Sequence, residues 1–369
     1  MSLPLLKKRG GDIFIPVIAV ALALFGIVAV YSASNYSALK DFGDRFYYVK
    51  KQAIGVCLGV AAMLFTANFR YERYKKIGLA AVIISLVLLG LVFVPGVGVE
   101  SYGAKRWIGL FGITVQPSEI AKFSLVLFAA GYFANKPQRV NKFAGILPVL
   151  LAGGAICILI IAEPNMSITM CVGMVTIGIL FAAGVKLRYI AAVTLPVAAA
   201  VPVLIIAEPY RLKRLSAFLD PWASPKGEGY QLLQSLYALG SGGWFGVGLF
   251  NSRQKFEFLP FSESDFILSV IGEELGFAGA VLFFAVTFFL VYRGIKTAAG
   301  AKDLHGCLIA TGITLIYAVQ VVVNALVVSG SIPPTGLPMP LISSGNTSVI
   351  VFLAAFGVLY NIGKESGAG

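Results

Sequence analysis

The chain has 369 residues, of which 58% are hydrophobic and only 12% are charged, with a net charge of +12 and a mean hydropathy of +0.87. Soluble domains carry about 25% charged residues, so this composition excludes an ordinary soluble protein and indicates a chain that crosses a membrane several times. The positive charge is interpreted as a signal of membrane topology rather than of nucleic-acid binding.

Apolar stretches recur along the whole chain at a length typical of membrane-crossing helices. They predict an all-α polytopic membrane protein with about ten transmembrane helices, forming one domain over residues 1–369. The first stretch follows a basic N-terminus but is too long for the apolar core of a signal peptide, so it is interpreted as an anchor. The ten segments cover approximately 13–33, 48–67, 77–95, 115–135, 144–162, 167–184, 188–206, 266–292, 306–329 and 347–362.

The distribution of lysine and arginine predicts the orientation of the helices. With the N-terminus in the cytoplasm, sixteen of these residues fall on the cytoplasmic side and six fall in the short outer loops. This asymmetry follows the positive-inside rule. Both termini are therefore predicted to be cytoplasmic, and the long loop of about 207–265, between predicted helices seven and eight, is predicted to be extracellular.

Several kinds of site are excluded or not indicated. The single histidine, His305, lies on the predicted cytoplasmic side, so an outer Ser-His-Asp triad or multi-histidine metal site is excluded. The four cysteines are scattered in apolar segments without CxxC spacing and indicate neither a disulfide framework nor a metal site. No nucleotide-binding motif is found, and the lack of an internal repeat argues against an inverted-repeat transporter.

Three outer loops, 98–123, 208–265 and 330–348, carry most of the remaining polar signals. In the longest, "YQLLQSLYAL" has apolar residues at helical spacing and predicts a short amphipathic helix at the interface. The glycine-dense "GSGGWFGVG" that follows predicts a turn in which the backbone can approach a ligand closely. Any chemistry is therefore expected to face outward.

Asp265 is the carboxylate of greatest interest, because it stands where the polar loop gives way to the apolar run "FILSVI". One interpretation is a helix N-cap that satisfies free backbone N–H groups. The other is a general base at the membrane–water boundary, where partial desolvation raises the pKa of a carboxylate. The two interpretations are compatible.

Other charged residues fall inside predicted membrane segments. Glu273 and Glu274 lie eight and nine residues beyond Asp265 on the predicted helix, and intramembrane acids normally face a cavity or a partner. Glu119 and Lys122 are three residues apart on one helix face, as in a structural ion pair. Alternatively, that pair lines a polar cavity that opens outward.

The outer loops also concentrate cations. Arg211 and Arg214 stand where the seventh segment leaves the bilayer, and arginine at headgroup depth suits bidentate contact with phosphate. Trp107 is typical of an interfacial aromatic belt, with substrate contact as the alternative. A carboxylate base and phosphate-binding arginines at the outer surface fit a transferase acting on a lipid-linked phosphate better than a channel.

These motifs, in order from the first segment to the last over about 350 residues, resemble the SEDS family, which includes FtsW, RodA and SpoVE. The "FLDPWASPKGEGYQ" and "SRQKFEFLP" stretches are closer to the FtsW/SpoVE branch than to RodA. The chain departs from the usual family pattern at "ESDFIL" and at Ser344–Ser348. The motifs that carry the resemblance are "AKRWI", "QPSEIAKF", "YRLKRLSAFLDPW", "GEGYQLLQSLYALGSGGWFGVGL", "SRQKFEFLP", "DFILSVIGEELG" and "IPPTGLPMPLISSG".

The resemblance implies a peptidoglycan glycosyltransferase that polymerises lipid II on the outer face of the bacterial cytoplasmic membrane, with inversion at the anomeric carbon. It implies that Asp265 is the essential aspartate and that a class B penicillin-binding protein, a transpeptidase, is the partner. A divalent cation, Mg²⁺ or Mn²⁺, is left open as an aid to departure of undecaprenyl pyrophosphate. The residues expected to bind the substrate are Arg211, Arg214, Trp107, Gln254, Lys255, Glu119, Lys122 and Glu273.

Two alternatives remain open at this point. A lipid II flippase would need a polar path that continues to the cytoplasm, and the inner halves of the predicted helices lack one. A non-catalytic scaffold for a division or sporulation transpeptidase would need no base at all. Polymerisation of labelled lipid II by the purified protein distinguishes both from the transferase.

Overall fold

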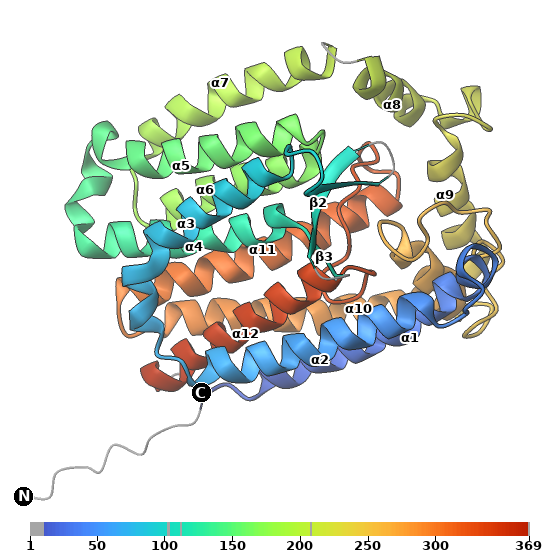
Figure 1. The fold of residues 1–369 in the computed structure, drawn as a ribbon, viewed down its shortest axis with the longest axis horizontal. Helices are drawn as coiled ribbons and strands as arrows, with labels where there is room; N and C mark the ends of the chain where they lie inside the picture. Colours follow the sequence, from blue (N-terminus) through green and yellow to red (C-terminus); the bar gives the residue numbers. More distant parts are fainter. Residues whose placement is uncertain (1–10, 102–103, 111–112, 207–208, 368–369) are drawn as a thin grey trace, which may run out of the picture.

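The computed structural model describes residues 11–101, 104–110, 113–206 and 209–367. Long helices form the body of the molecule and run in roughly the same direction (Figure 1). Each of the ten predicted apolar segments overlaps one of them. These helices are α1 (Phe14–Phe42), α2 (Tyr47–Asn68), α3 (Tyr74–Leu91), α4 (Pro117–Asn135), α5 (Phe143–Ala162), α6 (Met166–Ala182), α7 (Leu187–Ile206), α10 (Ile267–Ala299), α11 (Leu304–Val328) and α12 (Asn346–Ser366).

Seven spans in the described part of the chain are long and apolar enough to cross a membrane: α1, α2, α3 with the short helix η1 (Tyr71–Arg73) before it, α5, α10, α11 and α12. The helices α6 and α7 contain shorter apolar stretches, and α4 covers the remaining predicted segment. The mostly helical membrane architecture predicted from the sequence is thus confirmed.

The centre of the bundle is formed by α11 and α12. Of their candidate membrane spans, 61% and 67% of the residues are buried, against no more than 39% in any other candidate span. Edge-to-face contacts of Tyr317 with Phe352 and Phe356 fill the space between them, at ring-centroid distances of 5.9 and 5.3 Å. Such aromatic packing stabilises a core beyond the area that it buries.

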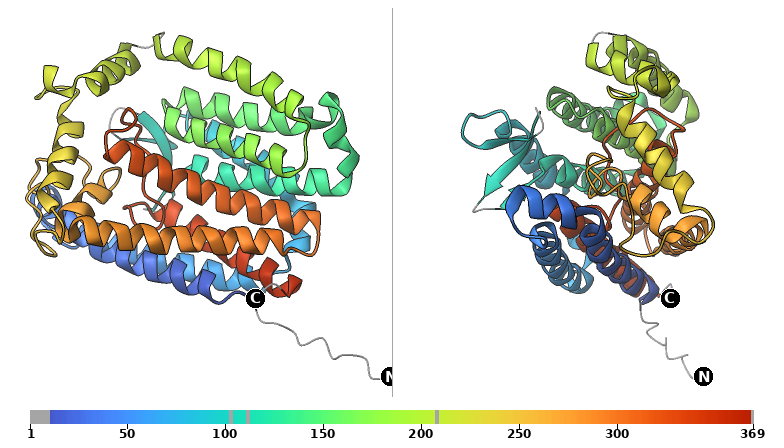
Figure 2. Two further views of the ribbon diagram at one scale, coloured as in Figure 1. Left: turned by 180° about the vertical axis from the view of Figure 1, so that it is seen from behind. Right: turned by 90° about the vertical axis from the view of Figure 1, so that its right-hand side faces the viewer.

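The two ends of the bundle differ. At one end Asp12, just before α1, pairs with Arg293 near the end of α10, and α12 finishes beside them (Figure 1). At the other end gather the strands, the helices α8 (Pro209–Leu219) and α9 (Tyr230–Gly242), and the loop between α11 and α12 (Figure 2). The predicted amphipathic helix in the long loop is α9. The described ends of the chain therefore lie opposite the long loop.

The all-α prediction was wrong in one respect, because three short strands between α3 and α4 form a small antiparallel sheet. Its strands β1 (Gly98–Ser101), β2 (Ala104–Leu110) and β3 (Ile113–Val115) pair in sequence order, with Val99 opposite Trp107 and Ile108 opposite Val115. Strands this short give little periodicity in the sequence, and their pairing satisfies backbone groups that a loop would leave to water.

The eighth predicted segment is also different from expectation. The helix α10 runs to Ala299 but is broken at Gly276, where φ is 67° and ψ is −168°. The chain from Gly242 to Gly248 fits against this break: Val247 N–H donates to the Glu273 carbonyl and Phe277 N–H donates to the Gly243 carbonyl. A Cβ on Gly276 would lie 2.3 Å from the backbone nitrogen of Gly246, so only glycine fits.

Glu119 and Lys122 form a buried ion pair on α4. Lys122 Nζ lies 2.8 Å from Glu119 Oε1 and donates at 2.7 Å to Oε1 of Gln320 on α11. Neither charged side chain has any exposed surface. The predicted ion pair is therefore confirmed and joins α4 to α11, while the predicted contact of Glu119 and Lys122 with substrate stays a prediction.

We predict that removing one of these charges costs more stability than removing both. Glu119→Gln or Lys122→Met alone leaves a buried unpaired charge, a loss of about 3–5 kcal/mol. The double variant leaves none and should melt closer to the wild type. Thermal unfolding of the three purified variants in detergent measures this, and equal melting temperatures would show that the pair is solvated.

Candidate active site

Asp265 lies at the end of the long loop, two residues before α10 begins at Ile267. The N-cap of α10 is Phe266, with no side-chain capping bond, so the N-cap interpretation of Asp265 was wrong. Its side chain is partly exposed, and its Oδ1 accepts a hydrogen bond from Ser264 Oγ at 3.3 Å. The Asp265 carboxylate is thus held at the end of the loop, and it does not accept a capping hydrogen bond from α10.

The electrostatic surroundings of Asp265 balance two opposing effects. Burial raises the pKa of its carboxyl group, while the hydrogen bond from Ser264 and the charges of Arg106 and Arg214 lower it, with a net rise above the ordinary value. The neighbouring Glu263 also has a raised pKa because of burial, and the negative charge of Asp265 adds to that rise. A carboxylate with a raised pKa is a stronger proton acceptor than an ordinary aspartate.

Gly336, in the loop between α11 and α12, lies directly against Asp265. A Cβ at this position would be 3.2 Å from Asp265 Oδ2, and the residue has φ of +73°. Glycine is the residue that adopts this conformation without strain. Because Gly336 lies so close, there is no room for a side chain at position 336 on this side of the Asp265 carboxylate.

The predicted cations occupy different positions. Arg214 lies on α8, and its guanidinium donates to the Pro334 carbonyl at 3.3 Å, so α8 is tied to the loop that carries Gly336. Arg211 lies one turn earlier on α8, which begins separately after α7, but its side chain falls outside the described part of the chain. Trp107 is a half-buried residue of β2, next to Arg106. Of these basic residues, Arg106 and Arg214 carry charges that act on the Asp265 carboxylate.

Glu273 and Glu274 hold the returning loop onto α10. Glu273 accepts hydrogen bonds from the Ser252 hydroxyl, from Arg253 N–H at 3.0 Å and from Gln254 N–H at 3.5 Å. Both oxygens are used in this way, which favours a structural role over substrate binding. The contact with Glu273 is made by the Gln254 backbone N–H, and the predicted contact of the Gln254 side chain with substrate stays a prediction.

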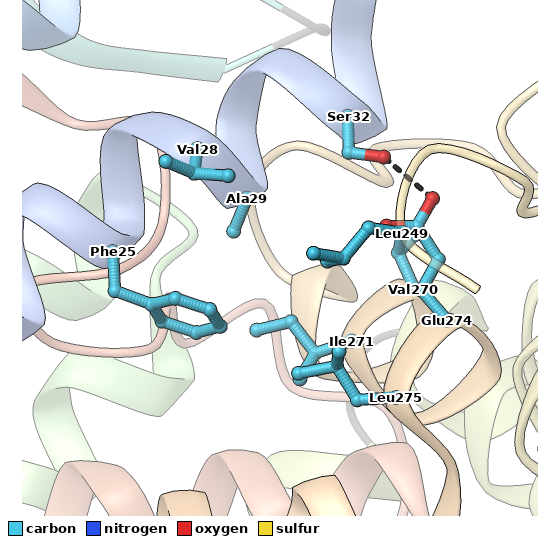
Figure 3. Close-up of a pocket in the computed structure, with 9 residues that line it drawn as sticks. All are labelled: Phe25, Val28, Ala29, Ser32, Leu249, Val270, Ile271, Glu274 and Leu275. Atoms are coloured by element: carbon cyan, nitrogen blue, oxygen red, sulfur yellow. Dashed lines mark hydrogen bonds between the residues drawn. The ribbon is translucent and has the colours of Figure 1, made fainter. Parts of the chain in front are cut away.

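Glu274 extends this support to α1. Its Oε1 accepts from the Ser32 hydroxyl at 2.5 Å and lies 3.7 Å from Lys255 Nζ, which also donates to the Phe250 carbonyl. Figure 3 shows Ser32 and Glu274 meeting above an apolar pocket between α1 and α10. Its cavity of about 10 Å³ is no larger than one water molecule needs, so it does not hold a sugar. Lys255 is buried and paired, and its contact with substrate stays a prediction.

Arg106 and Glu163 were not predicted as site residues from the sequence. Arg106 on β2 donates to the carbonyls of Glu163 and Pro164, at 3.2 and 2.6 Å, and so ties the sheet to the end of α5. The Glu163 carboxyl group is 1% exposed, and burial raises its pKa to about 8. A basic residue before Trp107 in an outer loop was the available signal, but its partners are more than fifty residues away.

The described residues contain no group of three or more His, Cys, Asp or Glu side chains that could hold a metal ion. Divalent cations such as Mg²⁺ are bound by several oxygen ligands, often completed by substrate phosphates. The described side chains therefore do not form such a site by themselves, and no step of the proposed reaction is assigned to a metal.

Comparison with known proteins places this site in a family. The family model described as "Cell cycle protein", named for FtsW, RodA and SpoVE, matches residues 13–367. The chain is 40% identical over 352 residues to a probable peptidoglycan glycosyltransferase FtsW of Trichlorobacter lovleyi, covering 95% of this chain and 92% of the relative. It is 37% identical over 362 residues to the stage V sporulation protein E of Bacillus subtilis, covering 98% and 99%.

Solved structures agree. A peptidoglycan synthase complex, described as coordinating polymerization and crosslinking, contains a chain that superposes with a TM-score of 0.79 at 27% identity, covering 96% of this chain and 98% of the other. The rod shape determining protein RodA of Thermus thermophilus matches the fold with a TM-score of 0.70 at 24% identity, covering 98% and 99%. The chain belongs to the FtsW, RodA and SpoVE family.

Proposed function

We infer that the chain is a peptidoglycan glycosyltransferase that joins lipid II units into glycan strands, and we propose that Asp265 is its general base. The observation that carries this assignment is the position of Asp265: a partly desolvated carboxylate at the loop end, with two arginines close enough to influence its pKa. The names of the relatives support the same reaction class.

The proposed reaction is one inverting displacement. Asp265 takes the proton from the 4-hydroxyl of the acceptor N-acetylglucosamine as that oxygen bonds to the anomeric carbon of the donor. The bond from this carbon to the diphosphate oxygen breaks, and its electron pair leaves with undecaprenyl pyrophosphate. Arg214, with Arg211 one turn away and Arg106 on the facing strand, supplies positive charge for that leaving group. A divalent cation bound with the diphosphate stays a prediction.

The proposed membrane placement puts this reaction on the outer face of the bacterial cytoplasmic membrane, with about ten spans and both termini cytoplasmic. The long loop lies at the opposite end of the bundle from the described chain ends, as this placement requires (Figure 1). We also propose a class B penicillin-binding protein as partner, which would crosslink the strands. The matched synthase complex, which combines polymerization with crosslinking, supports this pairing.

The flippase alternative is disfavoured by the central helix. Between Leu308 and Ile316, the buried residues of α11 are apolar apart from Thr314. Thr314 donates its hydroxyl to the Ala310 carbonyl of the same helix and offers no continuing path. The apolar side chains in this stretch are Leu308, Ile309, Ala310, Ile313 and Ile316.

Asp265→Asn should abolish polymerisation while leaving the fold intact. The amide has nearly the same shape but does not accept the proton, and loss of a positioned general base costs about 100- to 10,000-fold in rate. The measurement is polymerisation of fluorescent lipid II by the purified variant, with Glu263→Gln as the matched neighbouring control. Near wild-type synthesis by Asp265→Asn would disprove the general-base assignment.

The pH dependence should report the same carboxylate. Because burial raises the pKa of Asp265, kcat/KM should fall with decreasing pH at a higher pH than an ordinary aspartate, about 3.9, would give. Arg214→Ala removes a charge that lowers this pKa and should move the acid limb upward. Glu263→Gln removes a repelling charge and should move it downward. Identical acid limbs in all three proteins would contradict the assignment.

Arg214→Lys should lower turnover and Arg214→Ala should lower it further, to about one-hundredth. Lysine keeps the charge but loses the planar fork that binds two phosphate oxygens. The loss should appear in kcat as well as KM, because negative charge on the diphosphate grows in the transition state. Lys213→Ala, one position earlier on the same helix, is the control. An increase in KM alone would limit Arg214 to ground-state binding.

A further inference from the structure

The backbone around Asp265 is held by three consecutive carbonyl groups. The Glu263 carbonyl accepts from Ser344 N–H at 2.8 Å, and the Ser264 carbonyl accepts from the Ser343 hydroxyl at 2.5 Å. The Asp265 carbonyl accepts from Asn324 Nδ2 at 2.8 Å. All three donors come from α11 or from the loop that follows it, so the position of the loop end is set from outside the loop.

Asn324 is the most deeply placed of these donors. Its side chain is 1% exposed, and the same Nδ2 also donates to the Leu337 carbonyl at 2.7 Å. Both amide hydrogens are therefore used on backbone oxygens, one from each of the two loops that meet at the site. A single side chain fixes Asp265 relative to the loop of Gly336, whose Cα faces the Asp265 carboxylate.

The donor loop is itself anchored. Gln52 on α2 donates from Nε2 to the Ser343 carbonyl at 3.2 Å and accepts from Gly345 N–H at 3.3 Å. Ser343 Oγ accepts from Met339 N–H at 2.8 Å while it donates to Ser264. Buried polar networks whose members are bonded in this way are rigid and specify one geometry.

The backbone on both sides of these contacts is strained. Phe261 has φ of 56° and Leu341 has φ of 67°, in the left-handed region that side chains other than glycine rarely adopt. Such conformations persist only where the surrounding structure determines them, and they concentrate at functional sites. Without the three external donors, the turn from Phe261 to Asp265 would relax, because this would relieve the backbone strain at Phe261.

We propose that Asn324, assisted by Ser343, is a positioning residue for the general base: it holds the backbone of Asp265 so that the carboxylate keeps its place against Gly336. This proposal rests on the general-base assignment made above. Asn324 is 1% exposed and acts through the Asp265 backbone rather than on the substrate. Its effect is to keep the proton acceptor within the short range in which a displacement of about 1 Å costs about 100-fold in rate.

The test is Asn324→Leu, which preserves side-chain volume, adds no charge and removes both donors. We expect kcat for lipid II polymerisation to fall about 10- to 100-fold, with KM changed less than about two-fold. We also expect the acid limb of the pH profile to move to lower pH, because a released carboxylate is better solvated and loses the burial that raises its pKa. The charges that face it, Arg106 on β2, Arg214 on α8 and Glu263 beside it, are unchanged.

Asn361→Leu is a matched control. Asn361 on α12 is also a buried asparagine, 2% exposed, that bridges backbone groups: it donates to the Ala67 carbonyl at 2.9 Å and accepts from Tyr71 N–H at 3.0 Å. It lies at the opposite end of the bundle. We expect its substitution to lower the melting temperature to a similar degree and to leave the acid limb at its wild-type position.

Two outcomes overturn the proposal: wild-type kcat and acid limb in Asn324→Leu, or the same pH shift in Asn361→Leu. If Asn324→Leu does not fold, Ser343→Ala is the test. We expect this variant to lose less kcat and to shift the acid limb in the same direction. Wild-type behaviour of Ser343→Ala would count against the proposal. Activity retained by Asp265→Asn would instead disprove the general-base assignment. Asn324→Leu with wild-type behaviour beside an inactive Asp265→Asn disproves positioning alone.

Discussion

The proposed chemistry depends on keeping one carboxylate partly desolvated without leaving its charge uncompensated. Burial of Asp265 raises its pKa, and the guanidinium groups of Arg106 and Arg214 limit that rise. Too much burial would leave the carboxyl group protonated and unable to accept a proton, whereas full hydration would make it a weak base. The arrangement of the end of the bundle that carries the long loop supports this balance.

Each neighbouring element contributes one part of it. The sheet supplies Arg106 and is tied to α5 through the carbonyls of Glu163 and Pro164. The helix α8 supplies Arg214 and is tied to the loop after α11 through Pro334. The returning part of the long loop is fixed by Glu273 and Glu274 of α10, whose carboxylates accept hydrogen bonds from residues 252–254. The proposed catalytic carboxylate and the supporting carboxylates therefore lie close together in the sequence but have different roles.

Much of the fold follows from local sequence. Long apolar runs predict the helices, because the chain must satisfy its backbone groups internally wherever water is excluded. The spacing of "YQLLQSLYAL" predicts α9, and the spacing of Glu119 and Lys122 predicts their ion pair. Asp265 was predicted as a site residue because a carboxylate at a loop–helix boundary stands out in a chain with so few charges.

The remainder depends on contacts between distant residues. The strands of 98–115 are too short to show a period, and the break in α10 requires Gly276 to meet a loop thirty residues earlier. Asn324 donates across 59 residues to Asp265. A weaker signal was present: Gln320 and Asn324, four residues apart, place two amides on one face of an otherwise apolar segment, which indicates interior polar partners.

Equilibrium binding of lipid II to Asp265→Asn is the most direct test of the central claim that this residue takes a proton rather than holds the substrate. We predict a Kd within about three-fold of the wild-type value, since the amide preserves shape and the proposed cations for the diphosphate remain. A loss of binding as large as the loss of activity would contradict it, because Asp265 would then be a substrate ligand and the base would have to be another group.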